Sequence, residues 1–173
     1  EKAPTTIYDL HAPRTFPPLP KIPEAQLVVL EPTAILMLDT QKILAHATVG
    51  EPPVFPDSQW SDSLPKLFQA RIVQSFENAG YGRVDRENMD GIEADYKLSV
   101  DIRMFRLSVS PQPVGEAEFG AKLVDKDGRV VDTRIFRAQA PAKSADAPAA
   151  AAALDEAFGK AVTDLVLWTV GTI

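Results

Sequence analysis

The sequence predicts one α/β domain of the α+β kind, in which two long helices pack against a mixed, largely antiparallel sheet. Two observations lead to this fold class. Apolar residues recur at helical spacing in residues 64–76 and again in residues 154–168, whereas the long stretch between them alternates apolar and polar residues as strands do. A chain of 173 residues fits a single domain. Within it we separate residues 1–25, a short strand and a proline-rich segment, from residues 26–173, the main body.

The N-terminal part is expected to contain little regular structure. Residues 5–10 alternate enough for a short strand, and five prolines then crowd residues 11–23. Such density excludes a helix and favours extended or polyproline II backbone. The segment is therefore either an ordered crossover on the surface of the domain or a semi-rigid stalk.

Several short elements are expected next. Apolar runs predict strands in residues 26–30, 35–38 and 43–48, with a turn at 39–42. Residues 51–57 contain three prolines and are expected to form a loop that leads to Trp60.

The first helix is the most clearly marked element. Trp60 stands just before it, Pro65 lies in its first turn and Gly80 ends it as a C′ glycine. The apolar stripe that this helix must bury consists of Leu64, Leu67, Phe68, Ile72 and Phe76. None of these side chains is a nucleophile, a metal ligand or a phosphate-binding group, so the segment indicates assembly rather than catalysis.

After a short strand expected at residues 83–86, the longest strand pattern covers residues 95–110. Its apolar parity changes partway, which predicts a β-bulge or bend within residues 104–106. Residues 115–124 and 130–138 are expected to pair as a hairpin, with Gly128 in the turn. Residues 138–147 resemble a linker, after which Asp146 caps the last helix and Pro148 lies in its first turn. The buried stripe of that helix is Leu154, Phe158, Ala161, Leu165 and Trp168.

Composition and motifs exclude several classes of function. A net charge of −6 argues against a nucleic-acid partner, because phosphate binding relies on clustered basic residues. The absence of cysteine removes thiol chemistry and cysteine-rich metal sites. No cofactor-binding loop or nucleophile motif is present, and we expect no cofactor, no metal and no catalytic residues. His46 is expected at the surface or on an edge strand, and Asp101 is expected to pair with an arginine or lysine across the sheet.

The two tryptophans, Trp60 and Trp168, are expected mainly to pack, since rings of this size usually anchor a core. A second interpretation applies to Trp60. Together with Phe55 in the preceding segment, it would form an aromatic patch that contacts a partner. Phe55 and Trp60 are therefore the candidate partner-contact residues.

Short motifs follow one another in a recognisable order along almost the whole chain. They are Tyr8-Asp9-Leu10, Leu38-Asp39-Thr40, Trp60-Ser61-Asp62, Phe76-Glu77-Asn78, Asp101-Ile102-Arg103 and Gly128-Arg129-Val130. In this order and spacing, over about residues 7–168, the sequence resembles the ABC-type transport auxiliary lipoprotein family. That family includes the paraquat-inducible lipoprotein and the accessory lipoproteins of MCE lipid-transport systems. Many relatives carry a tyrosine before the Leu-Asp pair, where this chain has Met37.

The resemblance implies a function, which the spacing of residues alone does not reveal. Members are exported, lipidated on a cysteine just upstream of the mature domain, and held in the periplasm at the outer or inner membrane of a Gram-negative bacterium. They work beside an MCE substrate-binding protein, an ABC permease and an ATPase that move lipids or other hydrophobic molecules. The resemblance implies no active site in this chain, and it is compatible with a homo-oligomer.

Two functions are therefore expected. The first is a non-enzymatic accessory lipoprotein that docks onto an MCE-type transporter. The alternative is a periplasmic lipid-binding carrier, which would hold a hydrophobic molecule in an apolar cavity of several hundred Å³. An envelope hydrolase is disfavoured, because no nucleophile has a recognisable partner.

Overall fold

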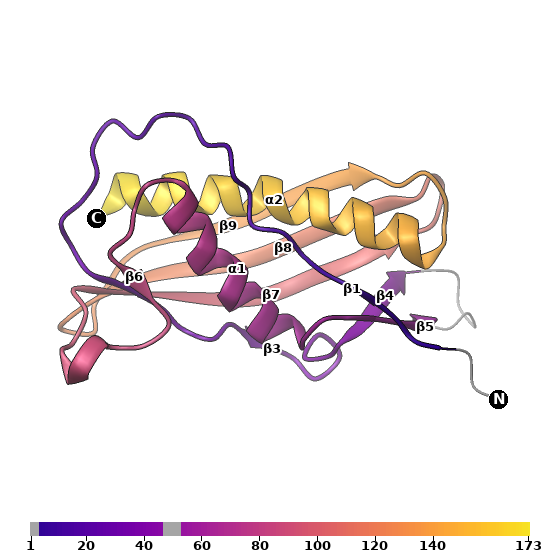
Figure 1. The fold of residues 1–173 in the computed structure, drawn as a ribbon, viewed down its shortest axis with the longest axis horizontal. Helices are drawn as coiled ribbons and strands as arrows, with labels where there is room; N and C mark the ends of the chain where they lie inside the picture. Colours follow the sequence, from indigo (N-terminus) through magenta and orange to yellow (C-terminus); the bar gives the residue numbers. More distant parts are fainter. Residues whose placement is uncertain (1–3, 47–52) are drawn as a thin grey trace.

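Three long antiparallel strands form the centre of the protein, in a computed structural model that describes residues 4–46 and 53–173 (Figure 1). They are β7 (Tyr96–Ser108), β8 (Val114–Asp125) and β9 (Val130–Pro141). Their register places Ile102 beside Phe119 and Phe119 beside Phe136. The turn between β8 and β9 contains Gly128 at a φ of 80°, a conformation that glycine adopts without steric cost. The expected hairpin is confirmed.

Short strands extend this centre into a mixed sheet. They are β1 (Thr6–Tyr8), β2 (Leu27–Val29), β3 (Thr33–Ala34), β4 (Lys42–His46), β5 (Val54–Trp60) and β6 (Val84–Asp85), and a single 3-10 turn, η1 (Met89–Gly91), follows β6. The strands β2, β3 and β4 all run parallel to β7, whereas β4 and β5 are antiparallel. The predicted fold class is confirmed.

The first helix, α1 (Leu64–Asn78), has the limits that its sequence predicts. Pro65 lies at its start, and Gly80 follows its end at a φ of 94°. The predicted stripe is fully buried, together with Val73 and Ser75. Phe68 is at the centre of this buried face, with ring centroids 4.8 Å from Phe158 and 5.1 Å from Phe105.

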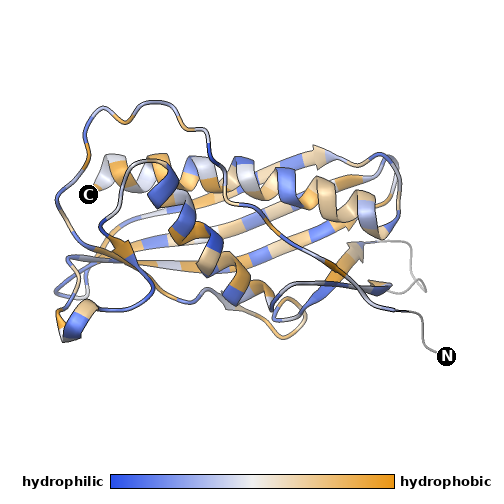
Figure 2. Ribbon diagram, viewed as in Figure 1, coloured by the Kyte–Doolittle hydropathy of each residue, from blue (hydrophilic) through white to orange (hydrophobic). Residues whose placement is uncertain are grey.

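The second helix, α2 (Ala147–Thr172), lies along β8 and β9. The Asp146 carboxylate accepts a hydrogen bond from the amide of Ala149 at 3.0 Å, so the predicted cap is confirmed. Trp168 is half-buried, and its indole nitrogen donates to Asp132 at 3.0 Å. Figure 1 shows both helices on the same side of the sheet, and Figure 2 shows apolar and polar residues alternating along the long strands.

The predicted parity change in β7 is present, one residue earlier than expected. Ile102 is paired with Phe119 and Met104 with Glu118, which leaves Arg103 as the extra residue of a β-bulge. Because of this bulge, the apolar residues on both sides of it face the helices and are buried. They are Leu98, Val100 and Ile102 before the bulge and Phe105 and Leu107 after it.

Three sequence predictions of local structure are wrong. Residues 36–38 form a turn and not a strand, because the amides of Leu38 and Asp39 both donate to the carbonyl of Ile35 at 2.9 Å. Residues 54–57 of the expected loop 51–57 belong to β5, which pairs with both β1 and β4. The expected linker begins later, since β9 continues to Pro141 beside β8. Part of the expected strand 43–48 lies outside the described residues.

The proline-rich segment is an ordered crossover, as one of the two interpretations predicted. Residues 11–23 contain neither helix nor strand, yet Phe16 and Leu19 pack against the core. At its start, the Arg71 guanidinium of α1 donates to both oxygens of Asp9, at 2.9 and 2.7 Å, and to the carbonyl of Leu10 at 2.6 Å. This contact joins the end of β1 to α1 and fixes where the crossover begins.

The Asp9–Arg71 contact should make stability depend on pH. Burial raises the pKa of Asp9, but hydrogen bonds from Arg71 and Ser61 outweigh it and hold this pKa below its ordinary value. A lowered pKa stabilises the fold above the unfolded value of about 3.9, and the contribution is lost as pH falls through the folded value. We expect Asp9→Asn to lower stability by about 1 kcal/mol or less at neutral pH, because solvent screens the pair.

Thermal denaturation of both proteins at neutral pH and at roughly pH 3 tests this expectation. The difference in Tm should be largest at neutral pH and clearly smaller in acid, because the contribution declines below the unfolded pKa. Glu77→Gln, on the exposed side of α1, serves as the control and should change Tm little at either pH. An equal difference between Asp9→Asn and the parent at both pH values would contradict the assigned role of the carboxylate.

Candidate docking surface

The two predicted contact residues lie in different environments. Trp60 has no exposed surface, and its ring centroid lies 5.7 Å from that of Phe105, so it packs in the core. Phe55 is half-buried near the start of β5. Of these two residues, Phe55 is the one with surface available to a partner, and whether it makes such a contact stays a prediction.

An apolar turn between β3 and β4 is the most exposed hydrophobic feature of the described chain. It consists of Ile35, Leu36 and Met37, which are 66%, 89% and 60% exposed. Leu38 follows directly and is buried, so one side chain of the run anchors the turn while three remain in solvent. Three consecutive exposed apolar residues are unfavourable for a soluble surface unless another molecule covers them.

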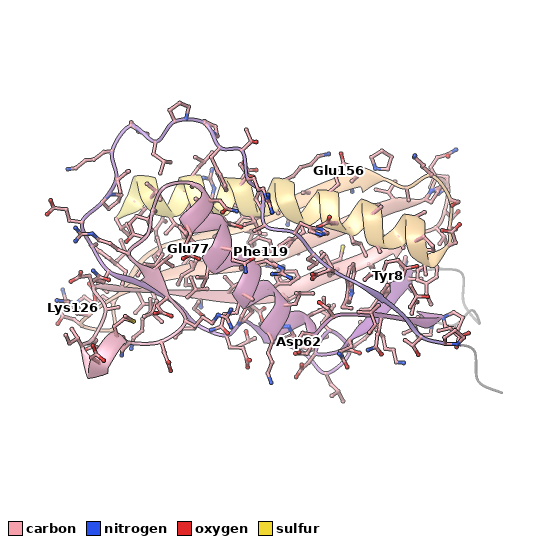
Figure 3. The ribbon with its side chains drawn as sticks, viewed as in Figure 1. Tyr8, Asp62, Glu77, Phe119, Lys126 and Glu156 are labelled. Carbon is pink, nitrogen blue, oxygen red and sulfur yellow. The ribbon has the colours of Figure 1, made fainter. Side chains whose placement is uncertain are left out.

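A second surface lies on the face of β7, β8 and β9 opposite the helices, here called the open sheet face. Its residues are Ser99, Asp101, Arg103, Arg106, Glu116, Glu118, Gly120, Lys122, Thr133, Ile135 and Arg137. Arg106 pairs with Glu116 at 3.4 Å, and Glu118 is shared by Arg103, at 3.0 Å, and Arg137. This face is mostly polar, although it also carries Ile135 and Met104, which stands opposite Glu118, whereas the buried face holds Phe119, labelled in Figure 3.

A trough crosses the open sheet face at Gly120. Thr33, Asp101, Gly120 and Ile135 are aligned across β3, β7, β8 and β9, and the missing side chain of Gly120 leaves a groove of about 730 Å³. On one side of this row stand Ser99, Lys122 and Thr133; on the other stand Arg103 and the Glu118–Arg137 pair.

Asp101 does not pair with a basic residue, so that prediction is wrong. The residue opposite it in β8 is Gly120, which has no side chain to offer. Asp101 instead accepts a hydrogen bond from the hydroxyl of Thr33 at 2.7 Å. His46 is exposed at the end of β4, as expected, and the other histidine, His11, contacts the Asp155 carboxylate at 2.9 Å.

Within residues 4–46 and 53–173, no three acidic or histidine side chains gather as a metal site would require. None of the described helices is long and apolar enough to cross a membrane. A groove of about 470 Å³ near the start of the crossover includes Arg71 and Gln74, but both side chains are already hydrogen-bonded to each other. Several polar side chains of the described surface are thus engaged with one another.

The chain belongs to a known family. The sequence matches the family of ABC-type transport auxiliary lipoprotein components over residues 8–166, and the chain is a member of it. An uncharacterized protein of Bradyrhizobium diazoefficiens, bll6063, is 40% identical over 163 residues, which cover 94% of this chain and 44% of that protein. The chain therefore spans less than half the length of this relative. Membership in a lipoprotein family implies a membrane-anchored protein of the cell envelope.

Solved structures share the same fold. The crystal structure of protein XCC0632 from Xanthomonas campestris has a TM-score of 0.83 and 32% identity, and the match covers 97% of this chain and 96% of that one. The PelC protein of Paraburkholderia phytofirmans, which was crystallised as a dodecamer, has a TM-score of 0.50 and 15% identity. That match covers 88% of this chain and 93% of PelC and shows likeness of fold alone.

Sequence reasoning missed two features of the surface. The apolar turn was interpreted as a strand, since four successive apolar residues fit a buried strand equally well. Gly120 interrupts an otherwise regular alternation in β8, and a glycine inside a strand marks a bulge, a bend or a place where a ligand or another backbone comes close. That second signal was present in the sequence.

Proposed function

We propose that this protein is a non-enzymatic accessory lipoprotein that docks onto an ABC transport system of the MCE type. Its partners are the MCE substrate-binding protein, the permease and the ATPase of one system, which moves lipids or other hydrophobic molecules. A lipidated cysteine upstream of the domain holds it in the periplasm, at the outer or inner membrane of a Gram-negative bacterium. The family of transport auxiliary lipoproteins supports this proposal.

The observation that carries the docking proposal is the apolar turn. Leu36 is 89% exposed, and the side chains on either side of it are also in solvent. Aliphatic burial contributes about 25 cal/mol per Å² of covered surface, so covering three such side chains favours association. A transporter subunit with an apolar recess is the occupant that the family membership supports.

The absence of enzymatic activity is supported by the arrangement of the polar groups. In the described part of the chain several ionisable side chains form pairs across strands, such as Arg106 with Glu116, and those that line the trough lie on an open sheet face. Docking needs no convergence of ionisable groups, because a few apolar anchors supply most of the energy of an interface.

Leu36→Asp should abolish docking without unfolding the protein. A charge in the centre of an apolar contact would have to be desolvated on binding, and we expect recovery of the partner to fall at least roughly tenfold. Stability should change by less than about 0.5 kcal/mol, because the side chain is already in solvent. The measurement is affinity capture of the full-length protein from bacterial envelopes, with quantitative mass spectrometry of the recovered subunits.

Met89→Asp provides the matched control. Met89 is 61% exposed in η1, far from the apolar turn in sequence, and the substitution makes the same apolar-to-acidic change. The Met89→Asp protein should capture as much of the permease or MCE subunits as the parent protein does. Equal recovery with Leu36→Asp, or no transporter subunit with any variant, would contradict the proposal.

One observation favours the alternative of a periplasmic lipid carrier. A groove of about 840 Å³ lies between the crossover and the end of α2, and its apolar lining includes Leu19, Ile22, Leu167 and Val170. Its volume is within the range of small-molecule sites. Native mass spectrometry of protein taken directly from envelopes tests this function: bound lipid that is lost in Val170→Asp would favour a carrier, and protein without lipid would exclude it.

A further inference from the structure

Two glycines of β8 differ in what the fold requires of them. At Gly115 a side chain would collide with α2: a Cβ atom would lie 2.9 Å from the carbonyl carbon of Ala153 and 3.0 Å from the amide nitrogen of Leu154. A Cβ atom is essentially never found closer than 3.0 Å to a backbone atom of another element, so the close packing of α2 on β8 explains this glycine.

Gly120 has no such explanation. A Cβ atom there would meet no other atom within 4 Å, and its φ is not in the left-handed region. A glycine inside a strand weakens the strand, because it packs no side chain and loses more backbone entropy on folding. Neither close packing nor backbone conformation therefore requires a glycine at position 120, and its open side faces away from the helices, into the trough.

We propose that the trough binds an extended segment of a partner protein, whose backbone lies against Gly120. In this pose an apolar side chain of the segment covers Ile135, and an acidic side chain pairs with Lys122. This inference rests on the proposed docking function and specifies the segment that one docking site recognises. It concerns a surface separate from the apolar turn.

The charges of the trough favour an acidic segment. Glu118 is already paired with Arg103 and Arg137, and one oxygen of Asp101 is bound by Thr33. Lys122, in contrast, has no ion-pair partner among residues 4–46 and 53–173, and it is exposed. A carboxylate on the partner would form an ion pair with Lys122. Such a pair contributes specificity as well as attraction.

The dimensions fit a polypeptide. The row from β3 to β9 crosses three strand spacings, about 14 Å, a length that about four extended residues cover. Ile135, at the edge strand, is 46% exposed and supplies an apolar end. The sides of the trough present the hydroxyls of Ser99 and Thr133. A polar trough with an apolar end at Ile135 matches a peptide better than an acyl chain, which has no polar groups for these side chains to bind.

Photo-crosslinking tests the proposal in the full-length protein within bacterial envelopes. A benzoylphenylalanine at position 135, at one end of the trough, should crosslink to a protein segment that mass spectrometry identifies by its peptide. That peptide should contain an aspartate or glutamate close to an apolar residue. Adding Gly120→Leu, which fills the trough, or Lys122→Glu, which reverses the charge, should reduce the product roughly tenfold or more.

Two control variants separate binding from general effects of substitution. Gly82→Leu adds the same side chain at an exposed glycine with no atom within 4 Å of its Cβ position, and Lys143→Glu makes the same charge reversal beyond β9. Both should leave the crosslink unchanged. The Tm of Gly120→Leu should be no lower than that of the parent, which would exclude unfolding as the cause of lost binding.

The possible outcomes divide clearly. Crosslinks that survive Gly120→Leu and Lys122→Glu, crosslinks only to lipid or to a second copy of this chain, or no crosslink at all would overturn the trough proposal. If transporter subunits are still captured by the parent protein in those cases, the docking function stands and only the trough is wrong. If no transporter subunit is captured but the trough crosslinks an acidic segment of another protein, the trough stands and the docking function is wrong.

Discussion

Phe68→Ala should destabilise the protein more than any other substitution considered. Phe68 is fully buried where α1, α2 and the sheet meet, with ring centroids 5.1 Å from Phe105, 6.1 Å from Phe119 and 4.8 Å from Phe158. Truncation of a buried phenylalanine costs about 3–5 kcal/mol, from lost burial and from the cavity that remains. In a domain of this size we expect Tm to fall by roughly 10 °C.

Urea denaturation of Phe68→Ala and of a surface control measures this effect. Ile135→Ala removes a side chain that is 46% exposed, and its stability should stay within about 0.5 kcal/mol of the parent. A loss of less than about 1 kcal/mol for Phe68→Ala would mean that this aromatic cluster does not hold the helices on the sheet.

Gly115→Val is the second large expected effect. The side chain would overlap the backbone of Ala153 and Leu154, and backbone atoms of a long helix move only if α2 shifts as a whole. Overpacking of this kind typically costs about 1–3 kcal/mol, and we expect the upper part of that range because no flexible side chain can give way. The free energy of unfolding from chemical denaturation is the measurement.

Gly120→Val is the matched comparison in the same strand. It makes the same chemical change where a Cβ atom meets nothing, so stability should be unchanged or higher by up to about 1 kcal/mol. The expected result is a loss of stability in Gly115→Val and no loss in Gly120→Val. If both variants destabilise the protein to the same extent, the close packing of α2 does not explain why position 115 is a glycine. Gly120 would then be required for the stability of the fold.

Most of the fold follows from patterns that are local in sequence. The stripe of α1 and its terminal Pro65 and Gly80 are sufficient to define that helix, because capping and helical periodicity act within a few residues. The bulge at Arg103 was visible as a change of parity, since a strand that keeps one face buried must insert a residue when its pattern slips. These elements are predicted well because their energetics do not depend on distant partners.

Elements that depend on partners distant in sequence were predicted poorly. The strand β5 contains Pro56 and Asp57, which local rules assign to a loop, yet it pairs with β1 on one side and β4 on the other. Residues 36–38 have the composition of a strand but form a turn that anchors Leu38 in the core. Pairing and burial across the chain outweigh the weak local preference in both cases.

The site was harder to predict than the fold, for a physical reason. Trp60 is the largest fully buried side chain, and nothing in its neighbours distinguishes a core tryptophan from an exposed one. Exposure is a property of the assembled surface, so it can be read only once the strands are aligned. This holds for the 89% exposure of Leu36 and for the trough beside Lys122.

The central proposal, that this chain is a docking scaffold of a transport system, is tested most directly by what it binds in the cell. The full-length protein would be isolated from envelopes in mild detergent, and co-purified proteins would be identified and quantified by mass spectrometry. We expect the MCE protein or the permease to be enriched, and to be lost with Leu36→Asp but not with Met89→Asp. Recovery of the protein alone with bound lipid, or a chemical turnover catalysed by the isolated chain, would contradict the proposal.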